Sequence, residues 1–123
     1  MASKGTTDSN SNPIGVPPST NTIVSSVNFK FAGRKPHEVF VIGEFSAECP
    51  QCAGDFVVGD IQVDGNTMMN TQVNNLNGAV GQIVVVSGVL TLRAGKHRFD
   101  LRAYTRAANF SVHHRSLTVI DLQ

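Results

Sequence analysis

The residues best suited to chemistry are two cysteines, Cys49 and Cys52, in the motif CPQC. A redox-active pair at this spacing needs its first cysteine at a helix N-terminus, where the helix dipole stabilises the thiolate. The residues that follow, AGDFVVGD, are typical of a loop and then a strand. The sequence therefore disfavours redox catalysis and favours a pair that is reduced in a cytoplasm and could later form a local or inter-subunit disulfide.

The histidines do not complete a metal site with these cysteines. His113 and His114 are adjacent, so on a strand they point to opposite faces and only one could join the cysteines as a zinc ligand. His37 or His97 could supply a fourth ligand, but no spacing supports either. We therefore expect no metal and no cofactor.

The acidic residues do not form a recognisable catalytic motif. They are scattered through expected turns and strand ends, and none stands beside a His or Ser in a nucleophile motif. A phosphate-binding glycine loop is also absent from the sequence. We therefore expect no catalytic residues and no enzyme activity.

Charge is sparse and unevenly placed. Charged residues make up 15% of the chain, which suits a surface packed against neighbours better than one that keeps monomers apart. Seven of the nine acids precede residue 65, and six of the ten basic residues lie between Arg93 and Arg115. Two interpretations stay open: two solvated faces of one domain, or complementary edges of neighbouring subunits.

The basic residues of the C-terminal part offer one candidate interface. Arg98, Arg102 and Arg106 are expected on one sheet face together with Tyr104. A phosphate-binding footprint usually accompanies a clear basic excess, whereas this chain has a net charge of +1 and a pI near 7.9. We expect a basic interface and disfavour nucleic-acid binding.

The elements that must position these residues are strands. Apolar and polar residues alternate in TIVSSVNFKF and HRFDLRAYT, and no stretch shows a convincing helical period. HEVFVIGEF is apolar on both faces, which predicts a strand internal to a sandwich or at an interface. Asp64-Gly65 predicts a type I′ hairpin turn, Gly88 indicates a bulge or bend, and the slip of period near His114 to Ser116 indicates a bulge.

The spacing of the turn signals predicts an all-β fold. About eight antiparallel strands in two packed sheets favour a β-sandwich of the jelly-roll type. An immunoglobulin-like sandwich is the second choice. It is less favoured because the chain has no Trp and no Cys pair spanning distant strands, which are features of that fold.

The N-terminal segment differs in composition from the rest. Residues 1–22 are mostly Ser, Thr, Asn, Gly and Pro, which predicts an extended or disordered arm outside a sandwich domain of residues 23–123. The contacts of this arm with another subunit are expected to involve Ile14, Val16, Pro17 and Pro18, and its deletion is expected to leave a folded sandwich. Neither a signal peptide nor a membrane-spanning run is expected.

Three stretches carry a resemblance to a known group of proteins. They are IQVDGNT, then VVSGVLTLRAGKHRFDLRAYT, then HRSLTVIDL. Their order resembles the terminal jelly-roll repeat of bacteriophage virion proteins, with the pattern L-x-A-G-x-H followed by R-x-L-x-V-I-x-L at the chain end. The matching residues are Leu92, Ala94, Gly95, His97, Arg115, Leu117, Val119, Ile120 and Leu122.

The resemblance implies a structural role. A protein of this kind would be a capsid decoration (cement) protein or a collar or tail accessory protein, which stabilises the virion through subunit contacts. Its partners would be further copies, in a trimer, and other virion proteins, after assembly in the host cytoplasm. A receptor- or carbohydrate-binding tip domain of a tail fibre is the alternative.

Overall fold

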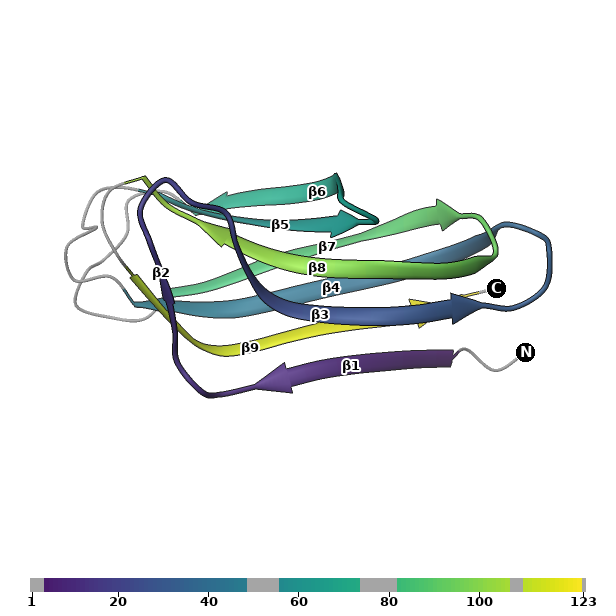
Figure 1. Cartoon of the computed structure of the whole chain (residues 1–123), viewed down its shortest axis with the longest axis horizontal. Helices are drawn as coiled ribbons and strands as arrows, with labels where there is room; N and C mark the ends of the chain where they lie inside the picture. The colour runs from purple at the N-terminus through teal and green to yellow at the C-terminus, as the bar shows by residue number, and fades with distance from the viewer. Residues whose placement is uncertain (1–3, 49–55, 74–81, 107–109, 123) are drawn as a thin grey trace.

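Nine β-strands in two sheets make up the part of the chain that the computed structural model describes, residues 4–48, 56–73, 82–106 and 110–122 (Figure 1). Cys49 and Cys52, and hence the expected disulfide, lie outside these residues. Sheet I has the order β1-β9-β4-β7, with β2 also paired to β9, and sheet II has the order β3-β8-β5-β6. The strands are β1 (Lys4–Asn10), β2 (Ile14–Val16), β3 (Thr22–Phe31), β4 (His37–Glu48), β5 (Val57–Val63), β6 (Asn66–Val73), β7 (Gln82–Leu92), β8 (Gly95–Tyr104) and β9 (Phe110–Asp121).

The strand pairing is that of a jelly roll. Strands β1 and β2 both run antiparallel to β9 and together act as one interrupted strand. Inside that pair, β3 pairs with β8, β4 with β7, and β5 with β6, as in a long hairpin folded over itself. Counting β1 and β2 together gives eight strands in two four-stranded sheets, so the expected all-β jelly-roll sandwich is confirmed.

Part of the expected N-terminal arm belongs to the sandwich. Lys4–Asn10 and Ile14–Val16 are extended, but they pair with β9 of their own chain. Val16 is fully buried in the core. The sequence-based boundary at residue 22 therefore needs correction from Lys4 onward, because backbone pairing with β9 holds even a polar segment that has few apolar side chains of its own.

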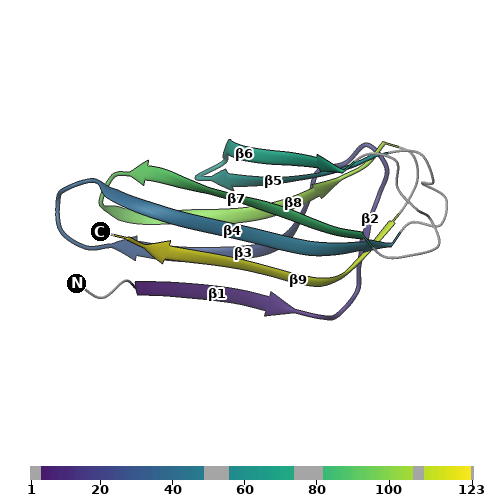
Figure 2. The ribbon, with the colours of Figure 1, turned by 180° about the vertical axis from the view of Figure 1, so that it is seen from behind.

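The core lies between the sheets and follows the expected alternation. On β8, Phe99, Leu101 and Ala103 are buried in the core, Arg102 is partly exposed, and Asp100 is buried among its polar partners. On β4, Val39, Val41 and Phe45 are fully buried. Figure 2 shows the long strands β4 and β9 of sheet I side by side, and both extend along most of the sandwich.

The local signals in the sequence have mixed outcomes. Asp64 and Gly65 both have positive φ, 51° and 85°, which confirms the type I′ turn between β5 and β6. The register between β4 and β9 shifts near His114, so that bulge is also confirmed. Of the bulge or bend expected at Gly88, the bulge is excluded, because β7 pairs with β4 without a shift. A Cβ at Gly88 would lie 3.1 Å from Cε of Met69, so a small residue there leaves room for the methionine of the opposite sheet.

Candidate functional site

The outward side of sheet I carries several large apolar side chains among polar ones such as Glu44, Ser87 and Thr118. The strand registers place Ile120, Phe40 and Val89 in one row across β9, β4 and β7. We call the following residues the apolar face: Phe40, Ile42, Ile83, Val85, Val89 and Ile120. Ile83, Val85 and Val89 are 69%, 44% and 59% exposed, on a strand that has no charged residue and no proline.

Strand β7 is also an edge strand. It pairs with β4 on one side and ends the order of sheet I. An edge strand of eleven residues with exposed apolar side chains lacks the charges, prolines and bulges that usually prevent edge-to-edge association. This edge and the apolar face therefore form a surface suited to contact with another protein chain.

The outward side of sheet II is charged, and most of its ions pair within the chain. Nε and an Nη of Arg102 donate to the two carboxylate oxygens of Asp60 at 2.8 and 2.6 Å. This hydrogen bond raises the pKa of Arg102 further above its ordinary value, against the opposing effect of burial. Arg106 lies over the Phe56 ring, with its guanidinium carbon 5.0 Å from the ring centroid.

These contacts bear on the uneven charge of the sequence. Asp60 comes from the acidic half of the chain and Arg102 from the basic half, and the two meet inside one subunit. Arg98 likewise binds Asp100 through Nε at 2.9 Å. Of the expected basic interface, Arg98 and Arg102 therefore lie on one outward face of β8, but their charges are largely offset by carboxylates.

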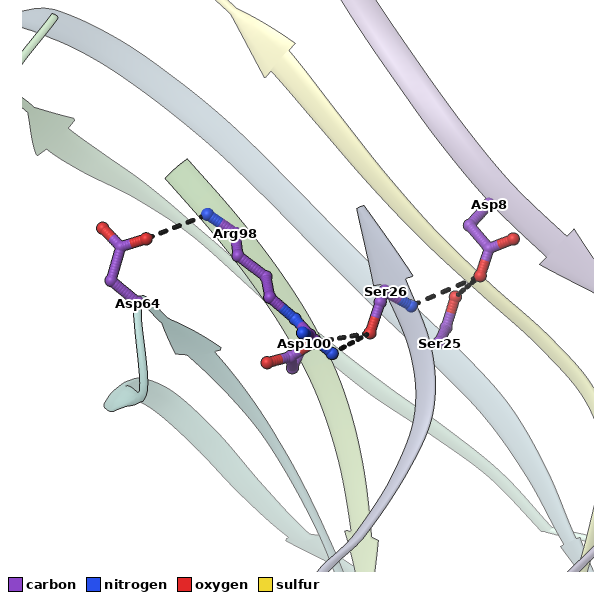
Figure 3. A network of polar contacts seen from close by, with 6 residues as sticks. All are labelled: Asp8, Ser25, Ser26, Asp64, Arg98 and Asp100. Carbon is purple, nitrogen blue, oxygen red and sulfur yellow. Dashed lines mark hydrogen bonds and ion pairs between the residues drawn. The ribbon is translucent and has the colours of Figure 1, made fainter. Parts of the chain in front are cut away.

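A chain of polar contacts ties the two sheets together on the β1 and β3 side (Figure 3). The Ser25 hydroxyl donates to Asp8 Oδ2 at 2.5 Å, which links β3 of sheet II to β1 of sheet I. The neighbouring Ser26 hydroxyl donates to Asp100 Oδ1 at 2.5 Å, where Arg98 also donates. The network holds the N-terminal strand in place, and each serine hydroxyl in it is bonded to a carboxylate.

Two histidines are held in the same way at one end of the sandwich. The His97 ring contacts Asp64 through Nδ1 at 2.6 Å and the Arg93 carbonyl oxygen through Nε2 at 2.7 Å. The His37 ring contacts Asp121 through Nδ1 at 2.9 Å and the Ala32 carbonyl oxygen through Nε2 at 2.7 Å. Both nitrogens of each ring therefore face an acceptor oxygen, and this fixes the orientation of each ring.

The surroundings shift the ionisation of two of these groups. The hydrogen bonds to Asp121 and to the Ala32 carbonyl raise the pKa of His37 above its ordinary value, against a smaller opposing effect of burial. Partial burial acts to raise the pKa of Asp64, but hydrogen bonds from the Arg98 backbone N–H and the His97 ring lower it below its ordinary value. The Asp64 carboxylate therefore links the β5–β6 turn to β8 in its charged form.

A groove of about 510 Å³ lies over β3, β8 and this turn. We call it the basic groove, and its lining residues are Asn28, Phe29, Lys30, Asp64, Lys96, His97 and Arg98. Lys30 and Lys96 stand directly opposite each other in the β3–β8 register. The sequence pattern does not reveal this pair, because the alternation places each lysine outward but does not give the register between two distant strands.

The expected assembly residues of the arm have different positions. Val16 is fully buried and Ile14 packs against the core of the same chain, so neither side chain is free to anchor the arm on another subunit. Pro17 and Pro18 are exposed. Among the described residues no three His, Cys, Asp or Glu side chains gather as metal ligands, and no helix there is long and apolar enough to cross a membrane.

Comparisons with known proteins show the fold. No protein-family model matches the sequence, and no curated protein matches it significantly. In structure, the chain is similar to infectious bursal disease virus VP2 in a subviral particle, with a TM-score of 0.63 and 13% identity over 96% of this chain and 32% of VP2. It is also similar to dimeric latent PorU from Porphyromonas gingivalis, with a TM-score of 0.57 and 8% identity over 98% of this chain and 13% of PorU.

A third similar structure covers most of its own chain. The C-terminal domain of EclA, described as a sugar-binding protein, has a TM-score of 0.54 and 11% identity over 89% of this chain and 79% of that domain. The chain spans only about a third of VP2 and a smaller part of PorU. At these identities the comparisons define a β-sandwich domain, a fold that VP2, PorU and EclA share, and function must be argued from the surface.

Proposed function

We propose that this protein is a structural subunit of a bacteriophage particle, a capsid decoration protein or a collar or tail accessory protein. It acts by binding and not by catalysis. Its partners are further copies of itself, in a trimer by analogy with the phage jelly-roll proteins that the sequence resembles, and other virion proteins. The particle is its final location.

The observation that carries this proposal is the apolar face with the unprotected β7 edge. Ile83, Val85 and Val89 expose apolar area that association would remove from water, at about 25 cal/mol for each Å² buried. Repetition of such a contact around a particle multiplies the binding strength through high effective concentration. The similarity to VP2 of a subviral particle supports the proposal at the level of fold.

The proposal is tested by placing a charge in the apolar face. Val89→Lys puts an ammonium group into the row formed with Phe40 and Ile120, where burial against another chain would leave it unpaired. Native mass spectrometry should show an oligomer for the unaltered protein and a folded monomer for Val89→Lys. Asn70→Lys, which adds the same charge on exposed β6 of sheet II, should keep the oligomer.

Localisation provides the second part of the test. The unaltered protein and Asn70→Lys should be found in purified particles, and Val89→Lys should be absent or strongly reduced. A monomer at high concentration that is missing from every particle would contradict the proposal.

A second candidate function is carbohydrate binding by a receptor-binding tip domain. The basic groove favours it, because about 510 Å³ is a volume typical of small-molecule sites and Asn28 and Phe29 contribute polar and apolar lining. The fold similarity to the sugar-binding domain of EclA agrees with this candidate. Specific binding on a glycan array that is lost with changes in the groove would support it.

A further inference from the structure

The basic groove contains an arrangement that a folded protein normally avoids. Lys30 and Lys96 are cross-strand partners on the outward side of sheet II, and like charges directly opposite each other are destabilising. Neither lysine makes an ion pair or side-chain hydrogen bond with a residue that the structure describes. Local arrangements that lower the stability of the fold are expected at functional sites.

The other charged residues of the groove already have hydrogen-bonding partners within the chain. Arg98 donates through Nε to Asp100, and Asp64 accepts from the His97 ring and from the Arg98 backbone N–H. The free cations are therefore the two lysine ammonium groups. An ammonium group acts as a compact point charge with three donors, which suits a tetrahedral oxyanion, whereas planar carboxylates are best matched by a free guanidinium.

Along β8, the unpaired positive charge does not extend beyond this groove toward the C-terminal end of the strand. Farther along β8, Asp60 neutralises Arg102 with two hydrogen bonds. A nucleic-acid chain needs a longer basic path than the one that the groove offers. A small ligand with one or two anionic groups fits the extent of the charge better.

We propose that the basic groove binds a sugar carrying a tetrahedral oxyanion, a sulfate or phosphate ester. Lys30 and Lys96 bind the oxyanion together, and Asn28, which lies on the same outward side of β3 as Lys30, contacts the sugar. This inference rests on the second candidate function and is independent of assembly through the apolar face.

The test is a titration of the full-length, ¹⁵N-labelled protein followed by NMR. The probes are galactose 6-sulfate, galactose, sodium sulfate and a short single-stranded DNA. Galactose 6-sulfate should shift amide signals of β3 and β8 near Lys30 and Lys96 in a saturable way, and added salt should weaken it. Galactose and sodium sulfate should each bind about tenfold more weakly or worse, because each lacks one half of the ligand.

Variants identify the lysines as the source of the selectivity. Lys30→Gln with Lys96→Gln should weaken binding of galactose 6-sulfate about tenfold or more, while Lys30→Arg with Lys96→Arg should retain most of it. Lys35→Gln, which removes an exposed charge outside the groove, should change nothing. Well-dispersed spectra of each variant show that it is folded.

The remaining outcomes overturn the inference in distinguishable ways. If galactose binds as tightly as galactose 6-sulfate, the oxyanion does not contribute to binding, but carbohydrate binding by the groove is still supported. If sodium sulfate binds as tightly as galactose 6-sulfate, the groove binds an oxyanion without recognising a sugar. If the DNA binds more tightly than galactose 6-sulfate, the ligand is a nucleic acid and not a sugar. If no probe shifts these amides, the inference and the second candidate function fail together.

Discussion

At the scale of single residues, the repulsion between two lysines should lower the stability of the fold. The cross-strand pair Lys30 and Lys96 brings two uncompensated charges together. We expect Lys96→Gln to stabilise the fold by about 0.2–1 kcal/mol, because the repulsion is removed. Chemical denaturation measures the change, with Lys35→Gln as the matched control. A destabilised Lys96→Gln would mean that the lysine has a structural partner.

His37 should make stability depend on pH on the neutral-to-alkaline side. Its pKa is raised in the folded state by hydrogen bonds to Asp121 and the Ala32 carbonyl. The stabilisation is therefore fully present below the ordinary pKa of 6.5 and is lost as the pH rises through the higher folded value. Thermal melts between pH 5 and pH 9 should show this loss, and His37→Gln should lack it.

A comparison with another histidine isolates the effect of His37. His114 is exposed, with Nε2 3.5 Å from a carboxylate oxygen of Glu44. His114→Gln should leave the pH dependence of the melting temperature in place. An unchanged pH profile in His37→Gln would show that the ring does not carry the effect.

Gly59 tests how closely the two sheets pack. An added Cβ would lie 2.9 Å from a methyl carbon of Val84 and 3.0 Å from a ring carbon of Phe45, both on the opposite sheet. Gly59→Ala should cost about 1–3 kcal/mol through overpacking. At Gly15 an added Cβ meets nothing within 4 Å, so Gly15→Ala should be nearly neutral. Urea denaturation compares the two, and equal stabilities would contradict the close packing.

At the scale of elements, Asp64 has two roles in the β5–β6 hairpin: it forms the turn, and its carboxylate binds β8. Asp64→Asn keeps a residue that accepts the positive φ of the turn but removes the charge beside His97. We expect a loss of about 1 kcal/mol at neutral pH, at the low end for a charged hydrogen bond because the side chain is 47% exposed. Guanidinium denaturation at pH 7 measures it.

The acid side of the pH profile provides the check on Asp64. Its pKa is lowered in the folded state, so its contribution is present above the ordinary pKa of 3.8 and is lost as the pH falls through the folded value. The difference between Asp64→Asn and the unaltered protein should therefore shrink in strong acid. A difference that stays constant down to pH 2 would assign the loss to the turn and not to the charge.

The elements also show what the sequence could predict. The Asp64-Gly65 turn and the two-sided apolar pattern of β4 are local signals, and the structure confirms them: the turn has positive φ at both residues, and β4 lies inside sheet I between β9 and β7. The docking of β1 was missed because its pairing with β9 depends on backbone groups and not on apolar side chains. The basic groove was missed for a related reason, since it depends on the register that brings Lys30 opposite Lys96.

At the scale of the whole molecule, the two outward sides differ in chemistry. Sheet I presents the apolar face, and sheet II presents paired ions and the basic groove. A subunit built in this way can assemble through one side while the other stays exposed to small ligands. The proposed assembly role and the proposed oxyanion site are therefore compatible in one particle.

The nested strand pairing makes the first strands essential to the whole fold. Deletion of residues 1–16 would remove the strands that pair with one side of β9, together with buried Val16 and the bond from Ser25 to Asp8. We expect a loss of about 4 kcal/mol or more, a large part of the 5–15 kcal/mol typical of a domain. Circular dichroism and urea denaturation measure it.

Val16 provides a milder version of the same test. Val16→Ala should cost about 2 kcal/mol, because the lost methyl groups lie in the core, whereas Pro17→Ala at an exposed position should cost much less. These losses would be seen in the isolated subunit, before any assembly. A truncated chain that folds with unchanged stability would instead favour a free arm that acts only between subunits.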